Sequence, residues 1–199
     1  KLKPANAKTI AVNGGFTAED LQQIFDLSLG GAVTVAGRSY ITPEHFGAYG
    51  NGTHTEDDYD ALHAAFDAAI ASRTDLYAPG RYYISQTLTI PATGESKVIN
   101  IRGNGYEFSF IAPMNSMANT PLIHIDGSAP LGLINSNWQD ISLSGGKQNG
   151  ARLDVVVDAE VLIGCIFEHV RIWGCNRIGL KLGYNYTNTF RMCFFQPYP

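Results

Sequence analysis

The sequence is poor in charged residues and has no long hydrophobic run. Charged residues make up 16% of its 199 residues, and the formal net charge is -4. Non-specific nucleic-acid binding depends on lysine and arginine neutralising phosphates, so this balance argues against nucleic acid as a partner. The longest apolar stretch, residues 161–167, is far shorter than the roughly 18 residues that a membrane helix needs. We therefore expect a globular core and no membrane insertion.

Cysteine is also scarce. The three cysteines, Cys165, Cys175 and Cys193, lack the paired spacing of a zinc site, and an odd count leaves at least one thiol unpaired. We interpret them as buried free thiols. Acidic residues do not follow the spacing of a calcium loop either. The sequence thus predicts no metal site and no cofactor.

Helical patterns occupy only the first part of the chain. Thr17 is placed to cap a short amphipathic helix that ends at Gly30, and residues 32–41 then alternate as one or two strands. A second capping pattern at 55–58 predicts a helix over about 55–72. Its apolar stripe consists of Leu62, Ala65, Phe66, Ala69 and Ile70. From residue 76 onward short apolar runs are broken by turn residues, which predicts only strands.

An internal repeat indicates the architecture. The segments that begin at Trp138, Phe167 and Phe190 share one pattern, with offsets of 29 (167 minus 138) and 23 (190 minus 167). A second pair of segments, 150–153 and 179–182, is also 29 residues apart, since 179 minus 150 is 29. Short strands that repeat every 20 to 30 residues or so are typical of a β-solenoid. Leucine-rich repeats and propellers are the alternatives, but their signature residues are missing from this sequence.

The alignment also predicts which side chains stack. Inward columns are expected for Ile141, Val170 and Cys193, and for Leu143, Ile172 and Phe195. Outward columns are expected for Ser142, Arg171 and Phe194, and for Ser144, Trp173 and Gln196. We therefore predict a mainly β protein, a right-handed single-stranded parallel β-helix with a short N-terminal α/β module and a capping helix. Residues 1–42 would form the neck or cap module, and residues 43–199 the start of the β-helix, with its first coils over about 76–199.

A glycine-rich segment resembles a known family. The run His45-Phe46-Gly47-Ala48-Tyr49-Gly50-Asn51-Gly52, followed by Asp57-Asp58 and by Tyr77-Ala78-Pro79-Gly80, is similar to the entry of the pectate-lyase-like superfamily. That entry reads approximately DFGA-x-GDG-x-x-DD, so His45 and Asn51 replace two acids of the family. In the family this motif is structural, with the helix covering the open end of the coil. The residues that the resemblance marks as structural are Phe46, Gly47, Gly50, Gly52, Asp57, Asp58, Pro79, Gly80 and Tyr83.

A small module before this entry is similar to bacteriophage tailspikes and capsule depolymerases. The resemblance implies a homotrimer on the virion tail that contacts other phage tail proteins and recognises bacterial surface polysaccharide, an O-antigen or a capsule. It also implies a parent protein that degrades the polymer as a glycoside hydrolase or a lyase. Because the chain stops at Pro199, one strand into a coil, we expect the active site to lie partly or wholly outside it. The alternatives are a non-catalytic neck that mediates trimerisation and receptor contact, and a secreted microbial pectin-type lyase or hydrolase.

Candidate site residues follow from the outward columns. An indole face packs on sugar C–H groups, so Trp173 and its neighbour Arg171 are candidates for substrate binding. The alternative is that both pack against a neighbouring chain. Glycoside hydrolysis needs two carboxyl groups about 5 to 9.5 Å apart, and Asp140 and Glu168 are the candidates for catalysis if both face outward. Solvated surface acids are the alternative.

Overall fold

The structure is a computed structural model that describes residues 1, 9–12, 23–26, 32–35, 40–92, 94–146 and 150–196. It is mainly β, and every pairing between its named strands is parallel. β1 (Thr9–Val12) and β2 (Ala32–Val35) form a small sheet of their own. No helix among the described residues has both the length and the apolar character needed to cross a membrane.

Three longer sheets make up the rest of the fold. The β11 sheet contains β3 (Tyr40–Ile41), β4 (Asp75–Tyr77), β7 (Ile101–Arg102), β11 (Asn137–Gln139), β14 (Ile166–Glu168) and β17 (Thr189–Arg191). The β12 sheet contains β5 (Arg81–Ile84), β8 (Phe110–Pro113), β12 (Ser142–Ser144), β15 (Arg171–Trp173) and β18 (Phe194–Gln196). The β13 sheet contains β6 (Leu88–Pro91), β9 (Ile123–Asp126), β10 (Leu133–Ile134), β13 (Val155–Ile163) and β16 (Ile178–Tyr186).

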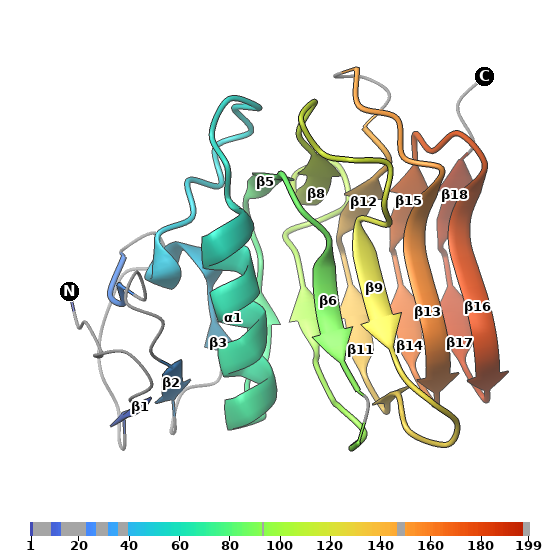
Figure 1. Ribbon diagram of the computed structural model, residues 1–199, viewed down its shortest axis with the longest axis horizontal. Coiled ribbons are helices and arrows are strands. Elements are labelled where there is room, and N and C mark those ends of the chain that lie inside the picture. Colours follow the sequence, from blue (N-terminus) through green and yellow to red (C-terminus); the bar gives the residue numbers. More distant parts are fainter. Residues whose placement is uncertain are drawn as a thin grey trace.

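The chain visits these three sheets in turn. From β7 onward each passage runs through the β11 sheet, the β12 sheet and the β13 sheet, and the next passage pairs with it in parallel. Figure 1 shows the strands advancing in this way from the helix toward the C-terminal end. The predicted register of the aromatic repeat is confirmed, since Trp138 pairs with Phe167 and Phe167 pairs with Phe190.

The structure does not pair the segments 150–153 and 179–182, so the second predicted repeat is wrong. β13 pairs with β16 at an offset of 23, as in Val157 with Leu180 (180 minus 157), instead of placing 150–153 beside 179–182. The reason is the connection between the β12 and β13 sheets, which has ten residues (145–154) after β12 but only four (174–177) after β15. The similar segment at 150–153 lies in the longer connection, and the six extra residues account for the change from 29 to 23.

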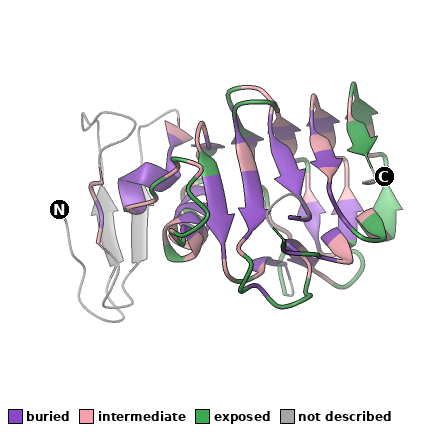
Figure 2. Cartoon of the chain, turned by 90° about the horizontal axis from the view of Figure 1, so that it is seen from above, coloured by how far each residue is buried: buried purple, intermediate pink, exposed green. Residues whose placement is uncertain are grey.

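The core lies between the three sheets. Facing positions are filled by in-register rows of apolar side chains that are almost completely buried, and each valine, leucine, isoleucine or phenylalanine contributes about 1.5–3 kcal/mol by leaving water. The rows include Ile101, Trp138 and Phe167 in the β11 sheet, Ile111, Leu143 and Ile172 in the β12 sheet, and Ile123, Val157, Ile125 and Ala159 in the β13 sheet. Burial is lost at the last strands, where Phe194 and Phe195 are about half exposed (Figure 2).

The expected inward columns are confirmed within that limit. Ile141, Val170, Leu143 and Ile172 are buried, whereas Phe195 lies on the last strand of its sheet and is 50% exposed. All three cysteines are free thiols; Cys165 and Cys175 are buried, and Cys193 is half-buried with its thiol 3.3 Å from the Phe167 carbonyl oxygen.

The outward columns have the predicted register, but their two serines are not on the surface. Ser142 is 2% exposed and Ser144 is fully buried. The segment before β8 crosses the outer face of the β12 sheet, where the Tyr106 ring lies 5.3 Å from Phe194 and Glu107 contacts Arg171.

Helix α1 (Tyr59–Ser72) packs at one end of the sheets (Figure 1), against β3, β4 and β6. Its buried face consists of Leu62, Ala65, Phe66, Ala68 and Ala69. The helix begins four residues later than the sequence predicted. Asp58 directs its carboxylate to the backbone amides of Tyr49 and Tyr83 rather than to the helix, and the Tyr59 amide donates to Asp57.

The predicted first helix is not present in its described part. Residues 23–26 are extended, and the Ile24 and Phe25 amides both donate to the His45 carbonyl oxygen at 2.8 Å. Phe25 is buried against Phe46, with ring centroids 5.2 Å apart, so tertiary packing overrides the helical pattern there. The other residues of that predicted helix lie outside the described part. Ahead of α1, a 3-10 helix, η1, spans Pro43–Phe46.

Candidate functional site

A row of polar side chains crosses the outer face of the β11 sheet. Backbone register places Tyr77, Arg102, Gln139, Glu168 and Arg191 side by side on five neighbouring strands. Alternate residues of a strand point to opposite faces, so these side chains lie opposite the buried row of Ile101, Trp138 and Phe167. We call these five residues the β11 row.

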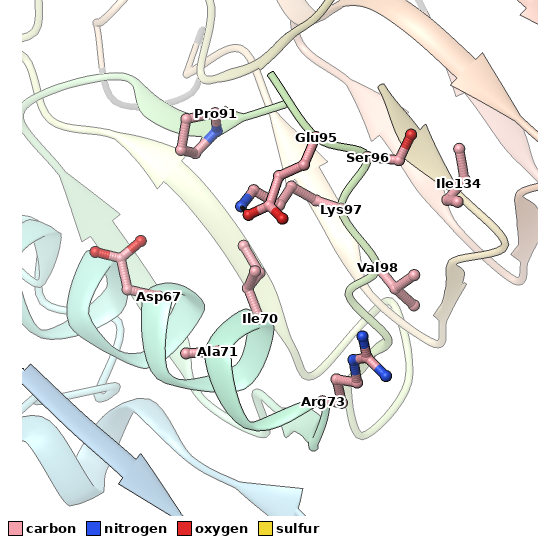
Figure 3. A pocket seen from close by; sticks show the side chains of 10 residues that line it. All are labelled: Asp67, Ile70, Ala71, Arg73, Pro91, Glu95, Ser96, Lys97, Val98 and Ile134. Atoms are coloured by element: carbon pink, nitrogen blue, oxygen red, sulfur yellow. Dashed lines mark hydrogen bonds and ion pairs between the residues drawn. The ribbon is translucent and has the colours of Figure 1, made fainter. Parts of the chain in front are cut away.

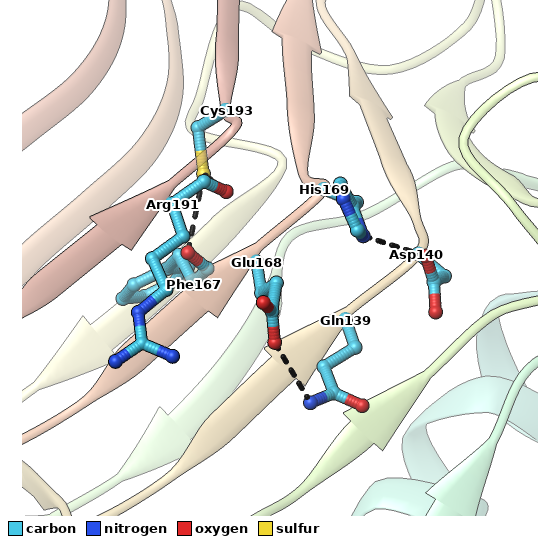
Figure 4. Close-up of polar contacts among 7 residues, drawn as sticks. All are labelled: Gln139, Asp140, Phe167, Glu168, His169, Arg191 and Cys193. Carbon is cyan, nitrogen blue, oxygen red and sulfur yellow. Dashed lines mark hydrogen bonds and ion pairs between the residues drawn. The ribbon is translucent and has the colours of Figure 1, made fainter.

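Contacts within the β11 row fix its side chains only weakly. The Arg102 guanidinium lies over the Tyr77 ring, 5.2 Å from its centroid, and Tyr77 also meets Tyr40 edge to face at 5.4 Å. Farther along, the Gln139 amide donates to Glu168 Oε2 at 3.5 Å (Figure 4). The row therefore presents to solvent an aromatic ring that Arg102 partly covers, together with two cations, an amide and a carboxylate.

The corner that follows these strands has a repeated backbone conformation. Asp140, His169 and Met192 each adopt a left-handed conformation, with φ of 55°, 52° and 47°. This region costs a non-glycine residue about 1–3 kcal/mol, although aspartate and histidine tolerate it better than most. Backbone hydrogen bonds between consecutive passages stabilise the corner. The Asp140 amide donates to the Glu168 carbonyl oxygen, and the His169 amide donates to the Arg191 carbonyl oxygen.

Two of the corner residues form an ion pair when the histidine is protonated. His169 Nδ1 lies 3.3 Å from Asp140 Oδ1, and both side chains are about two-fifths exposed (Figure 4). Glu168 and Asp140 thus come from the same edge of the β11 sheet, but each carboxylate contacts a different partner, Gln139 or His169.

A hollow of about 370 Å³ lies where the β11 row meets the corner. The wall of this hollow at Gly103 has no room for a side chain. A Cβ there would lie 2.3 Å from the Asp140 carbonyl oxygen and 2.8 Å from the Ser109 side chain. The hollow is lined by Tyr77, Arg102, Gly103, Asn104, Gly105 and Asp140. Its size and its mixture of ring, guanidinium, amide and carboxylate groups fit a small polar unit such as one sugar.

Of the candidate catalytic residues, Asp140 lies at the corner and lines the hollow, and Glu168 lies in the β11 row; a catalytic role for the pair stays a prediction. Sequence reasoning did not single out the polar residues around them, which are Tyr77, Arg102, Asn104, Gln139, His169 and Arg191. The repeat offsets already held part of the signal, because positions 139, 168 and 191 follow the same steps of 29 and 23. Tyr77 and Arg102 lie on earlier strands, where the offset from Ile101 to Trp138 is 37 (138 minus 101), and no repeat linked them.

The candidate sugar-binding pair lies elsewhere, on the β12 sheet. The Arg171 guanidinium covers the Trp173 ring at 4.6 Å from its centroid and also contacts Glu107 and Gln196. One face of the indole is therefore occupied by the chain itself. Trp173 Nε1 is buried and has no hydrogen-bond partner within the described part of the chain. A sugar-binding role for this pair stays a prediction.

The residues marked as structural by the glycine-rich entry lie around α1 and β5. Gly47, Gly50 and Gly52 have positive φ, and a Cβ on Gly80 would lie 2.7 Å from the Gly50 carbonyl oxygen. The remaining members hold neighbouring segments: Asp57 accepts from Ser85, the Pro79 carbonyl accepts from Ser109, and Tyr83 packs edge to face on Phe110.

Two buried carboxylates lie beneath this glycine-rich segment. Glu44 accepts a hydrogen bond from the Tyr82 hydroxyl at 2.7 Å, and Asp58 accepts from the Tyr49 and Tyr83 amides. Burial raises the pKa of both carboxyl groups above their ordinary values, although these hydrogen bonds act in the opposite direction. Their partners are within the protein, which indicates a structural role.

A larger hollow of about 790 Å³ lies between α1 and the segment that follows β6 (Figure 3). Ile70, Val98 and Ile134 supply its apolar surface. Its four charged side chains are Lys97 and Glu95, which pair with each other, Asp67, which pairs with His63, and Arg73. The β11 row remains the stronger candidate for an extended ligand, because its polar side chains continue over five neighbouring strands.

Comparisons with known proteins identify the fold but not a family. No protein-family model and no curated protein matches the sequence. Among solved structures, ORF18 of Geobacillus virus E2 matches with a TM-score of 0.56 and 20% identity over 71% of this chain. The pre-mature gene product 12 of bacteriophage phi29 matches with a TM-score of 0.55 and 17% identity over 74% of this chain. The alignments span 27% and 21% of those two chains, so the likeness is one of fold over about a quarter of their lengths.

Proposed function

We propose that the chain is the N-terminal part of a phage tailspike that binds bacterial surface polysaccharide, an O-antigen or a capsule. The two proteins with similar folds come from a virus and from a bacteriophage. Their origin supports a virion location and contacts with other phage proteins. The resemblance of the glycine-rich entry to the pectate-lyase-like superfamily supports the same class. The longer protein would be a homotrimer that degrades the polymer it binds.

The proposal includes the architecture. We infer that the three sheets are the faces of a right-handed parallel β-helix, with α1 covering its first coil. Each passage from β4 to β16 supplies a parallel strand to each sheet, with β10 as a second strand of the β13 sheet, and neighbouring passages pair in register, as a β-helix requires. Residues 1–42 would then form the neck module.

The observation that carries the proposal is the β11 row. Neighbouring strands lie about 4.8 Å apart, so the four steps between five strands span about 19 Å of sheet surface. An extended, shallow row of this length suits a linear polymer better than a compact ligand. Tyr77 offers a ring for sugar C–H groups, while Arg102 and Arg191 offer guanidinium donors for hydroxyls or for uronate carboxylates.

Binding and cleavage test the proposal separately. The 199-residue chain is titrated with a panel of purified O-antigens and capsules, and the variants Arg102→Ala and Glu168→Gln are compared with wild type. We expect one polymer to bind and each variant to weaken binding at least tenfold. The matched control is Lys181→Ala, which removes an exposed cation from the β13 sheet. Binding that is absent for the whole panel, or equal in all variants, would contradict the proposal.

The non-catalytic alternative is favoured by one feature of the site. Of the two candidate acids, Asp140 lines the hollow, whereas Glu168 lies on the open β11 row and contacts Gln139. Release of reducing ends or unsaturated uronates by the chain, lost in Asp140→Asn and Glu168→Gln, would assign catalysis to this pair. Binding without cleavage would make these coils a receptor-contact module. Activity on polygalacturonate together with a monomeric mass by light scattering would favour the secreted pectin-type enzyme.

A further inference from the structure

Three side chains with metal-binding atoms converge on the outer face of the β13 sheet. They are His124 and Asp126 of β9 and Glu160 of β13. One ligand atom from each lies within 4.8 Å of the other two. This face belongs to a different sheet from the β11 row, and the proposed function does not use it.

Strand geometry explains why the three meet. His124 and Asp126 are alternate residues of one strand and therefore share a face. The register pairs His124 with Asp158 and Ile125 with Ala159, which brings Asp126 level with Glu160 on the next strand. The arrangement depends on the backbone, and flexible loops take no part in it.

Two of the three side chains are acids at directly opposite positions of neighbouring strands, where like charges repel. The strands on either side place uncharged residues level with this pair: Pro91 pairs with Asp126 on one side, and the register of β13 with β16 brings Gly183 level with Glu160 on the other. A cation bound between the two acids would offset their repulsion. The adjacent cation, Lys181, pairs with Asp158 at 2.9 Å. A backbone amide, that of Gly127, donates to Glu160 Oε2.

The site is also open toward solvent. Glycine is required at 183, because a Cβ there would lie 2.5 Å from the Glu160 carbonyl oxygen. As a result no side chain from β16 covers the Glu160 carboxylate, which is exposed, while His124 and Asp126 are half-buried. The His124 imidazole makes no hydrogen bond or ion pair within the described part of the chain. A cation could therefore take three protein ligands and keep solvent in its remaining positions.

We propose that His124, Asp126 and Glu160 bind one divalent transition-metal ion, with Zn²⁺ as the best match. An imidazole nitrogen with two carboxylate oxygens is a ligand set typical of zinc, whereas calcium takes oxygen ligands in greater number. The ion would connect β9 to β13, two strands that belong to consecutive passages of the chain. The site would thereby stabilise the sheet from outside the core.

Calorimetric titration of the untagged chain with ZnCl₂ tests the proposal. We expect one Zn²⁺ per chain, tighter binding than for CaCl₂, and a higher Tm in the presence of Zn²⁺. Each of the variants His124→Gln, Asp126→Asn and Glu160→Gln should weaken binding at least about tenfold, since loss of a ligand costs no less than loss of its supporting partner. Asp158→Asn is the matched control, because it removes a neighbouring acid of the same face but no ligand.

Thiols and other histidines are the competing zinc ligands. Cys193 is the least buried of the three cysteines, so Cys193→Ser separates thiol binding from the proposed site. The proposal requires that Zn²⁺ binding survive Cys193→Ser and Asp158→Asn with unchanged stoichiometry. Absence of binding at millimolar Zn²⁺, equal affinity in the three ligand variants, or tighter Ca²⁺ binding would each overturn it.

Discussion

The Tyr82 hydroxyl donates a 2.7 Å hydrogen bond to the buried carboxylate of Glu44, which is 38 residues away in the sequence. The same hydroxyl accepts a hydrogen bond from the Gly80 amide at 3.0 Å. Tyr82 lies on β5 and Glu44 in η1, so one phenol connects the entry segment to the first strand of the β12 sheet. Tyr82 is fully buried and Glu44 is 2% exposed, so water cannot replace either contact.

Removal of this hydroxyl should therefore destabilise the fold. Tyr82→Phe leaves a buried carboxyl group and a backbone amide without their partner, and we expect a loss of about 1–3 kcal/mol in the free energy of unfolding. Urea denaturation followed by circular dichroism measures it. Tyr49→Phe is the control, because Tyr49 is 58% exposed and its change should stay within about 0.5 kcal/mol. Equal effects of the two variants would contradict this account.

Burial of Glu44 also predicts a pH dependence. Its pKa is raised in the folded protein above the ordinary value of 4.5, chiefly because burial disfavours the charged form. The folded state then binds more protons than the unfolded state. This contribution to stability is fully present below pH 4.5 or so and is lost as the pH rises through the raised pKa.

The variant Glu44→Gln isolates that contribution, because it keeps a side-chain oxygen for Tyr82 but cannot ionise. Relative to wild type, the variant should gain stability as the pH is raised from about 4 to about 8. Unfolding free energies at four pH values in this range provide the measurement. Asp58 also has a raised pKa, and its charge acts on Glu44, so the comparison is repeated in an Asp58→Asn background. A difference that stays constant across the range would show that Glu44 is not the group responsible.

His45 takes a structural position at which the resembling family has aspartate. The imidazole is fully buried, and its Nδ1 accepts a hydrogen bond from the Thr42 amide at 3.1 Å. His45→Ala removes the acceptor and leaves a cavity, so we expect a loss of about 2–4 kcal/mol. His45→Asn places an oxygen where Nδ1 was and should lose about 1 kcal/mol less than alanine. Thermal unfolding of both variants tests whether the acceptor matters or only the volume does.

The repeat made the later strands predictable, whereas the earlier ones lack a constant spacing. Trp138, Phe167 and Phe190 were paired correctly because their strands differ by offsets that also appear in the sequence. The pairing of 150–153 with 179–182 failed because four similar residues do not reveal that a connection differs by six residues. The start of the helix was also predicted incorrectly. Aspartate is a common helix-capping residue, but the Asp58 carboxylate accepts hydrogen bonds from two backbone amides of other segments.

The variable spacing between strands also limited the prediction of the candidate site. Asp140 and Glu168 could be named as candidates because they lie on repeated passages, and Arg102 was not named because its strand precedes the repeat. Strand periodicity likewise did not predict the burial of Ser142 or the contact of Arg171 with Glu107, which lies on the segment before β8.

The exposed aromatic residues at the last strands predict self-association of the 199-residue chain. Phe190 and Phe195 pair with buried residues of the preceding strands, yet they are 38% and 50% exposed. Exposed apolar patches beside unpaired strand edges promote association between chains. The double variant Phe190→Lys and Phe195→Lys should lower the mass measured by light scattering at high concentration. Tyr49→Lys changes an equally exposed ring elsewhere and should leave that mass unchanged, whereas a decrease in both would contradict a specific role of these strands.

Gly103 follows Arg102 of the β11 row and packs against the corner residue Asp140. A Cβ at this position would lie 2.3 Å from the Asp140 carbonyl oxygen, a backbone atom that cannot move without shifting the corner. Gly103→Ala should therefore cost about 2 kcal/mol or more and displace Asp140 and Asn104. Gly179→Ala is the matched control, because the atoms nearest its Cβ would belong to side chains and not to the backbone, Ile172 at 3.1 Å and Phe195 at 3.9 Å, and its cost should stay near 1 kcal/mol. Because Asp140 and Asn104 line the hollow, Gly103→Ala should weaken polysaccharide binding and Gly179→Ala should not. Urea denaturation and polymer titration of both variants separate the two effects, and unchanged binding in a folded Gly103→Ala protein would move the binding site away from this corner.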